Sequence, residues 1–100
     1  MAEIMVTAAE LRRKADELRK LDEQFKSEVG NLSDTENSLN GMWEGQSHDA
    51  FHNAFQHDKA QWDNFYTVIQ NYCTALENIA TKYEQVENQN AEIANTRTYS

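Results

Sequence analysis

Apolar residues recur along the first part of the chain at spacings that alternate between four and three. A heptad pattern of this kind, sustained over about four repeats, predicts a helix that packs lengthwise on another helix. Asp22 and Glu36 occupy the two positions that break the pattern. Thr7 and Glu10 have the spacing of a capping box, so we expect this helix to span about residues 8–40. Its seam consists of Leu11, Ala15, Leu18, Phe25, Val29, Leu32 and Leu39.

A second heptad pattern follows, with Asp58 as its single interruption. It predicts a helix over about residues 47–87. The pattern then fades into a polar stretch, and we expect a fraying helix end and a flexible tail over about residues 88–100. The second seam consists of Phe51, Phe55, Trp62, Phe65, Ile69, Tyr72, Leu76, Ile79, Tyr83 and Val86.

The segment between the two patterns, residues 41–46, is expected to be a tight turn. Gly41 and Gly45 flank Trp43-Glu44, and glycine can adopt the left-handed angles that stop one helix and redirect the chain. Trp43 can plug the end of a two-helix core, or mark a surface that a partner reads, and the two roles are compatible. The fold class is therefore all-α, an antiparallel two-helix hairpin.

The second helix carries more apolar surface than one partner helix can cover. Beside the seam lie Tyr66, Val68, Cys73, Ala75 and Ala80, all near mid-helix, which predicts a second contact centred on residues 62–80. Two helices also enclose little interior, so we expect dimerisation into a four-helix bundle. The predicted dimer face consists of Trp62, Phe65, Tyr66, Ile69, Tyr72, Cys73 and Leu76.

Composition and charge narrow the functional classes. One hundred residues make one domain, and the absence of proline suits long helices. A net charge of −8 without a basic stripe argues against nucleic acid and membrane surfaces as partners. We find neither a secretory signal peptide nor a membrane-spanning apolar run. Cys73 is the only cysteine, interpreted as a small residue beside the core, with a disulfide between chains as the alternative.

No constellation of residues predicts catalysis or a cofactor. His48 and His52 stand four residues apart, a spacing at which two histidines can share a metal ion. No third ligand follows at a clear spacing, because His57 falls on another part of the helix surface. We therefore interpret the pair as polar residues near a helix start and predict no metal site and no enzyme.

Taken together, these features resemble the WXG100 family, the ESAT-6-like (Esx) small secreted proteins. The resemblance rests on the chain length, the Trp43-Glu44-Gly45 turn between two helices, and the opening Val6-Thr7-Ala8-Ala9-Glu10-Leu11-Arg12. It also rests on Tyr83-Glu84-Gln85-Val86-Glu87, which fits the family's Tyr-x-x-x-Asp/Glu export signal. The match covers nearly the whole chain.

The resemblance implies export, as a folded dimer, by a type VII (ESX-like) secretion system and its FtsK-like ATPase, with the cytoplasm as the place before export. Trp43, Glu44 and Gly45 would form the turn motif, and Tyr83 and Glu87 the C-terminal secretion signal. The partner would be a second copy or a related WXG100 protein. A role in virulence or competition is open, and the alternative function is a cytoplasmic helical adaptor or chaperone for a secreted partner.

Overall fold

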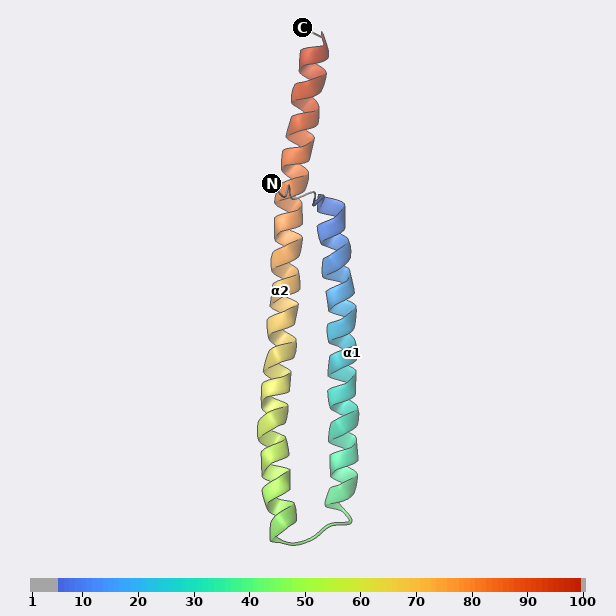
Figure 1. The fold of residues 1–100 in the computed structure, drawn as a ribbon, viewed down its shortest axis with the longest axis vertical. Helices are drawn as coiled ribbons and strands as arrows, with labels where there is room; N and C mark the ends of the chain where they lie inside the picture. Colours follow the sequence, from blue (N-terminus) through green and yellow to red (C-terminus); the bar gives the residue numbers. More distant parts are fainter. Residues whose placement is uncertain (1–5, 100) are drawn as a thin grey trace, which may run out of the picture. The chain divides into compact units, whose positions relative to one another are not determined.

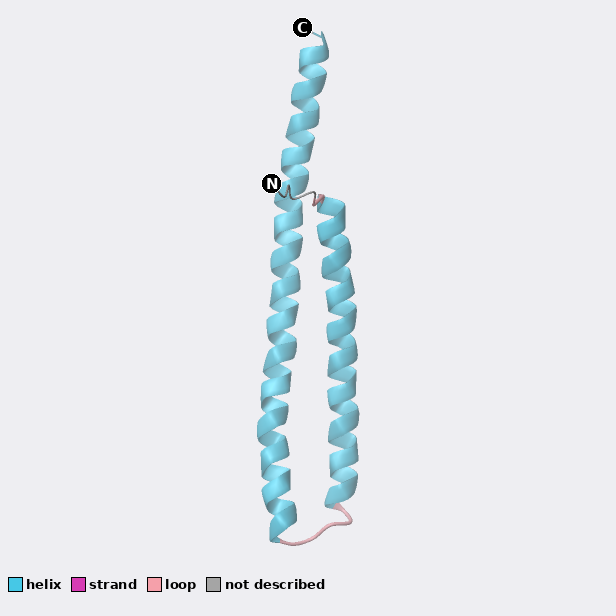
Figure 2. Cartoon of the chain, in the orientation of Figure 1, coloured by secondary structure: helices cyan, strands magenta, loops and turns pink. Residues whose placement is uncertain are grey.

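The computed structural model of the chain describes the backbone of residues 6–99 and the side chains of residues 6–92. It contains two helices, α1 (Ala8–Asn40) and α2 (Gln46–Tyr99), and no strand within the described residues (Figures 1 and 2). The bounds of α1 coincide with the predicted helix over residues 8–40. At its start, the amide of Glu10 donates to Thr7 Oγ1 at 3.1 Å, as the capping box predicts.

The second helix is longer than the heptad pattern predicts. Helix α2 does not end near residue 87 but continues to Tyr99, and Ser100 lies outside the described residues. The stretch after residue 87 contains neither proline nor glycine, so nothing in the backbone stops the helix. The fading of the apolar pattern therefore marks the end of packing, because residues 88–92 are all exposed, and not the end of the helix.

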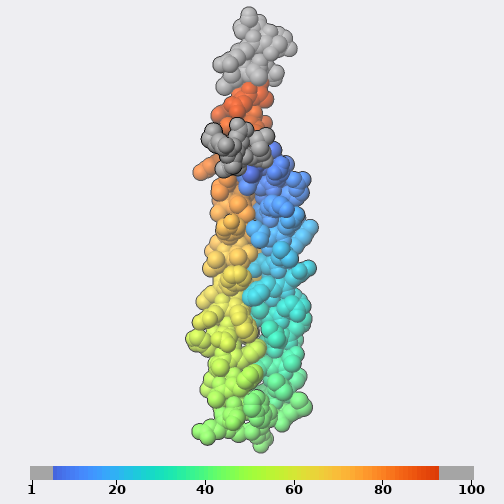
Figure 3. All heavy atoms as spheres, in the orientation of Figure 1, coloured from blue at the N-terminus to red at the C-terminus, as the bar shows by residue number. Residues whose placement is uncertain are grey.

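The chain divides into two compact units, Met1–Leu18 with Asn71–Ser100, and Arg19–Gln70. Both are built from a stretch of α1 and a stretch of α2. The Arg19–Gln70 unit is a helical hairpin, in which the end of α1 and the start of α2 run antiparallel and meet through the turn (Figure 1). In space-filling view, the side chains of its two helices lie against each other (Figure 3).

In the other unit, the first turns of α1 lie beside the later part of α2, and polar contacts join them. Arg12 Nη2 donates to Glu84 Oε2 at 3.1 Å and lies 3.4 Å from Thr81 Oγ1. All three side chains are exposed, so this ion pair contributes little to stability. Ala8 and Ala15 of α1 and Cys73 and Ala80 of α2 are buried.

The buried positions of α1 repeat every seven residues and include both residues that break the apolar seam. Within the described residues, these positions are Ala8, Ala15, Asp22, Val29 and Glu36. The interruptions at Asp22 and Glu36 are thus polar layers inside the hairpin. Gln70 Nε2 donates to Asp22 Oδ2 at 2.9 Å, and Arg19 Nη1 donates to Gln70 Oε1 at 2.6 Å, which compensates the buried carboxylate.

Candidate functional site

The turn between the helices is closed by backbone hydrogen bonds on both sides. The amides of Met42 and Trp43 both donate to Leu39 O, at 3.0 and 2.9 Å, and the amide of Asp49 donates to Gly45 O at 3.2 Å. Gly45 has a φ of +115°, which an L-residue rarely adopts. Gly41 does not have a positive φ, so the expectation of left-handed angles at both glycines is wrong for Gly41.

Trp43 packs on the first turns of α2 and remains partly accessible. Its ring lies edge-on to His48, with centroids 5.4 Å apart, and is tilted against Phe51 at 5.7 Å. The side chain keeps 36% of its surface exposed. Glu44 and Gly45 beside it are exposed too. The turn motif is therefore held by α2 while its outer surface faces solvent.

A buried polar cluster lies next to this ring, and sequence reasoning found only part of it. His52 Nδ1 lies 2.5 Å from Glu36 Oε1, and the imidazoles of His48 and His52 stack with centroids 5.9 Å apart. The sequence indicated the histidine pair but not Glu36, because this residue comes from α1 and only the hairpin brings it to them. The one signal for it was a carboxylate at a seam position.

Tyr83 and Glu87 of the predicted secretion signal lie beside the start of α1. With Val6 and Val86 they line a shallow groove. The Tyr83 side chain is 41% exposed, although it continues the heptad seam. Glu87 also contacts α1, because its Oε1 accepts a hydrogen bond from the amide of Ala8 at 3.3 Å. A carboxylate there satisfies a free amide and complements the helix dipole of α1.

The structure differs from the prediction in which residues of α2 face α1. Residues expected beside the seam, Tyr66, Cys73 and Ala80, are half-buried or buried in the single chain. Residues expected within the seam are exposed along α2 at spacings of seven or fourteen residues: Phe51, Phe65, Tyr72, Ile79 and Val86. The structure thus leaves a line of large apolar side chains uncovered by α1.

Cys73 is the clearest correction to the predicted dimer face. It has 0% exposed surface, so it cannot contribute to a contact with a second chain or form a disulfide with one without rearrangement. The interpretation of Cys73 as a small residue beside the core agrees with this burial. Among the other predicted face residues, Phe65 and Tyr72 are exposed, while Trp62, Tyr66, Ile69 and Leu76 are half-buried.

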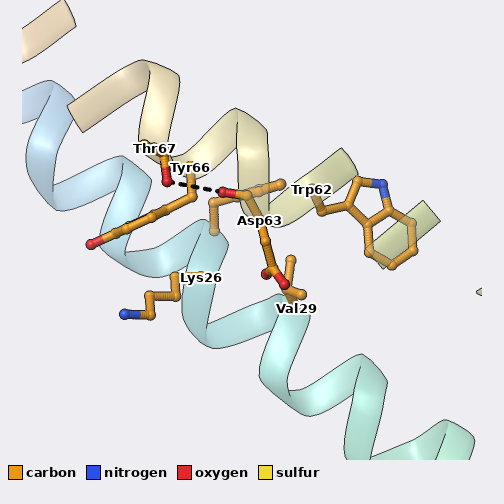
Figure 4. A pocket seen from close by; sticks show the side chains of 7 residues that line it. Lys26, Val29, Trp62, Asp63, Tyr66 and Thr67 are labelled. Carbon is orange, nitrogen blue, oxygen red and sulfur yellow. Dashed lines mark hydrogen bonds between the residues drawn. The ribbon is translucent and has the colours of Figure 1, made fainter. Parts of the chain in front are cut away.

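Trp62 and Tyr66 line a groove between the two helices of the hairpin (Figure 4). Lys26 and Val29 of α1 form its other side, and Lys26 Nζ lies 4.9 Å from the centre of the Tyr66 ring. The Tyr66 hydroxyl donates to Glu23 Oε1 at 2.6 Å, and this hydrogen bond raises the pKa of Tyr66 above 10.0. Tyr66 therefore contacts α1 within the same chain, and only part of its surface is available to a second chain.

Comparisons with known proteins agree with this arrangement. The family model described as "WXG100: Proteins of 100 residues with WXG" matches residues 3–89. A search of curated proteins found no match. Within the described residues, no helix is both long enough and apolar enough to cross a membrane.

Similar solved structures include Esx proteins from two bacteria. The crystal structure of the secreted protein EsxB from Bacillus anthracis strain Sterne is 29% identical, with a TM-score of 0.76, over 87% of this chain and 99% of that one. Wild-type EsxB from the same strain, in space group P21, is 30% identical, with a TM-score of 0.75, over 84% of this chain and 97% of that one. EsxA from Geobacillus thermodenitrificans is 26% identical, with a TM-score of 0.80, over 89% of this chain and 97% of that one.

Proposed function

This chain belongs to the WXG100 family, and on that premise we propose that it is a small substrate or carrier protein exported as a folded dimer by a type VII secretion system. The solved relative EsxB is a secreted protein. For this chain, export is an inference that rests on shared family and on the accessibility of the two motifs described above.

The observation that carries the proposal is the exposure of the Tyr83 ring beside Glu87. A recognition signal must present side chains that a partner can reach, and 41% of Tyr83 is accessible in the single chain. The two residues are four apart on one helix, so they share a face. Trp43, at 36% exposed, offers a second accessible aromatic in the turn motif.

Dimerisation is supported by the apolar side chains that remain exposed on α2. The apolar residues buried within the described part of the chain are mostly small: Ala8, Ala15, Val29, Cys73 and Ala80. Large side chains such as Phe65 and Tyr72 remain half exposed, and burying them against a second chain would remove apolar surface from water. A homodimer satisfies this need, and a heterodimer with a related WXG100 protein is the alternative.

In this proposal the partner that reads the signal is the FtsK-like ATPase of the secretion system. The direct experiment compares the natural host with a strain that lacks this ATPase. Wild-type protein is expected in the culture medium of the first strain and only in the cells of the second. A cytosolic marker protein, absent from both media, controls for lysis.

The alternative function, a cytoplasmic helical adaptor or chaperone, gives a different result in the same experiment. The protein would then stay in the cells of both strains, and a secreted partner would be lost from the medium when this gene is deleted. Retention in both strains would overturn the proposal of an exported substrate.

A further inference from the structure

Three potential metal ligands converge in the Arg19–Gln70 hairpin, close to the turn. They are Glu36 of α1 and His48 and His52 of α2, and one donor atom of each lies within 4.8 Å of the other two. The two histidines are four residues apart, so their rings project from the same side of α2, and the rings stack at 18° to each other. The carboxylate reaches them from the facing helix.

Two atoms of this cluster are buried without a hydrogen-bond partner: Glu36 Oε2 and His48 Nε2. The residues Glu36 and His48 are only 3% and 8% exposed, so water reaches these atoms poorly. Buried polar atoms almost always have partners, because an unpaired one has lost its hydration without compensation. Both atoms belong to one cluster of three metal-binding side chains, so a single cation could satisfy them together.

Asp49 holds His48 in the form that can bind a metal. Its Oδ1 lies 3.3 Å from His48 Nδ1, so the carboxylate accepts the Nδ1 proton and leaves the lone pair on Nε2. A carboxylate behind a histidine is the usual arrangement around zinc, since it fixes the ring and makes the ligand nitrogen more basic. The nitrogen that this leaves as a ligand is the one without a partner.

We propose that Glu36, His48 and His52 form a binding site for a divalent transition-metal ion of the Zn²⁺ class. Imidazole nitrogens with one carboxylate oxygen suit zinc, and three protein ligands leave a fourth position for water. Bonds of about 2.0–2.1 Å place tetrahedral ligand atoms about 3.4 Å apart, which small side-chain movements reach from the present separations. The ion would replace the direct contact between His52 Nδ1 and Glu36 Oε1.

A metal at this site would join the last turns of α1 to the first turns of α2, on either side of the turn motif. Trp43 packs edge-on to His48, so the metal would also fix the support of that ring. The inference does not depend on the proposed export function, because it concerns only the residues around the turn.

The experiment is a calorimetric titration of Zn²⁺ into the full-length, tag-free protein after removal of metal with a chelator. We expect one Zn²⁺ per chain. His52→Gln should weaken binding by at least about 100-fold, since the loss of a ligand should exceed the 10–100-fold cost of losing an outer-shell partner. Asp49→Asn, which removes no ligand, should weaken it by about 10–100-fold.

The matched control is His57→Gln, because His57 lies on the same helix with an exposed side chain and is not one of the three ligands. This variant should bind Zn²⁺ as the wild type does. His52 is only half-buried, so His52→Gln should keep its fold, which circular dichroism checks. A wild type that binds no Zn²⁺, or a His52→Gln variant that binds as well as the wild type, overturns the proposal.

A second measurement locates the ion. In the Trp62→Phe variant, Trp43 is the only tryptophan, and Co²⁺ at the site should quench its fluorescence because the ring contacts His48. Adding His52→Gln should abolish the quenching. Quenching that persists unchanged in the double variant would place the ion elsewhere and contradict the assignment.

Discussion

At the scale of single residues, the turn depends on only one of its two glycines. Gly45 has a φ of +115°, and a side chain there should cost about 1–3 kcal/mol of stability. A Cβ at Gly41 would meet only Ser38 O, at 3.6 Å, which is an ordinary contact. We therefore expect Gly45→Ala to lower the free energy of unfolding in urea and Gly41→Ala to change it by less than about 0.5 kcal/mol. Equal effects of the two substitutions would contradict this account of the turn.

The ionisation of Tyr66 makes the stability of the fold depend on pH in the alkaline range. The hydrogen bond from its hydroxyl to Glu23 exists only while the phenol is protonated, so it raises the pKa of Tyr66 above 10.0. The stability that this bond contributes is complete below pH 10.0 and is lost as the pH rises through the folded-state pKa. A difference titration of tyrosinate absorbance, wild type minus Tyr66→Phe, should show a group ionising above pH 10.0. A midpoint at or below that pH would disprove the contact.

Glu87 illustrates what the sequence leaves open at this scale. Its place one position after Val86 indicated an exposed flank, and its side chain is indeed exposed. Its hydrogen bond to the amide of Ala8 joins residues that are 79 positions apart, so no local pattern could predict it. An alanine at this position would therefore remove a helix cap as well as the charge of the signal.

At the scale of elements, the heptad spacing predicted both helices because proline is absent and the apolar residues keep one face. It assigned the faces of α2 less well. Apolar residues cover about half of the circumference of the helix over residues 62–80, so two neighbouring lines of positions could both serve as the seam. Helix α1 packs on the line of α2 that contains Tyr66, Cys73 and Ala80. The buried side chains of α1 are mostly small or polar, and they allow the two helices to approach each other closely there.

A substitution at Gly30 tests whether a second chain packs against this side of α1. A Cβ at Gly30 would meet nothing within 4 Å in the single chain. Gly30→Ala should then stabilise the isolated fold by about 0.5–1 kcal/mol through helix propensity alone. Thermal unfolding at a fixed protein concentration measures this change. A lower melting temperature would mean that a second chain approaches the backbone closely at this position.

The candidate metal site could be predicted only in part, because one of its ligands is a polar residue buried inside the hairpin. A heptad pattern reports where apolar residues stand, and it treats Asp22 and Glu36 as interruptions. Both are buried because α2 supplies partners, Gln70 for one and His52 for the other. Such pairs become visible only when the register of the two helices is known. The His48 and His52 pair could be found by spacing, but its carboxylate could not.

At the scale of the whole molecule, we expect a dimer through the exposed line on α2. Light scattering at micromolar concentration should give about twice the chain mass of 11.6 kDa. Tyr72→Asp places a charge on a side chain that is 56% exposed in the single chain, so it should shift the mass toward the monomer. Asn78→Asp adds the same charge at an exposed position off this line and should leave the dimer intact. A monomeric wild type, or a dimeric Tyr72→Asp variant, would contradict the proposed face.

The most direct test of the central claim is the amount of Glu87→Gln protein in the culture medium of the natural host. Glutamine keeps an oxygen that can accept from the Ala8 amide and removes only the charge, so circular dichroism and dimer mass should match the wild type. Glu84→Gln is the matched control, since it removes a charge from the same helical turn outside the Tyr83 and Glu87 spacing. The account predicts that Glu87→Gln is depleted from the medium and retained in the cells, while Glu84→Gln is exported normally. Undiminished export of Glu87→Gln would contradict it.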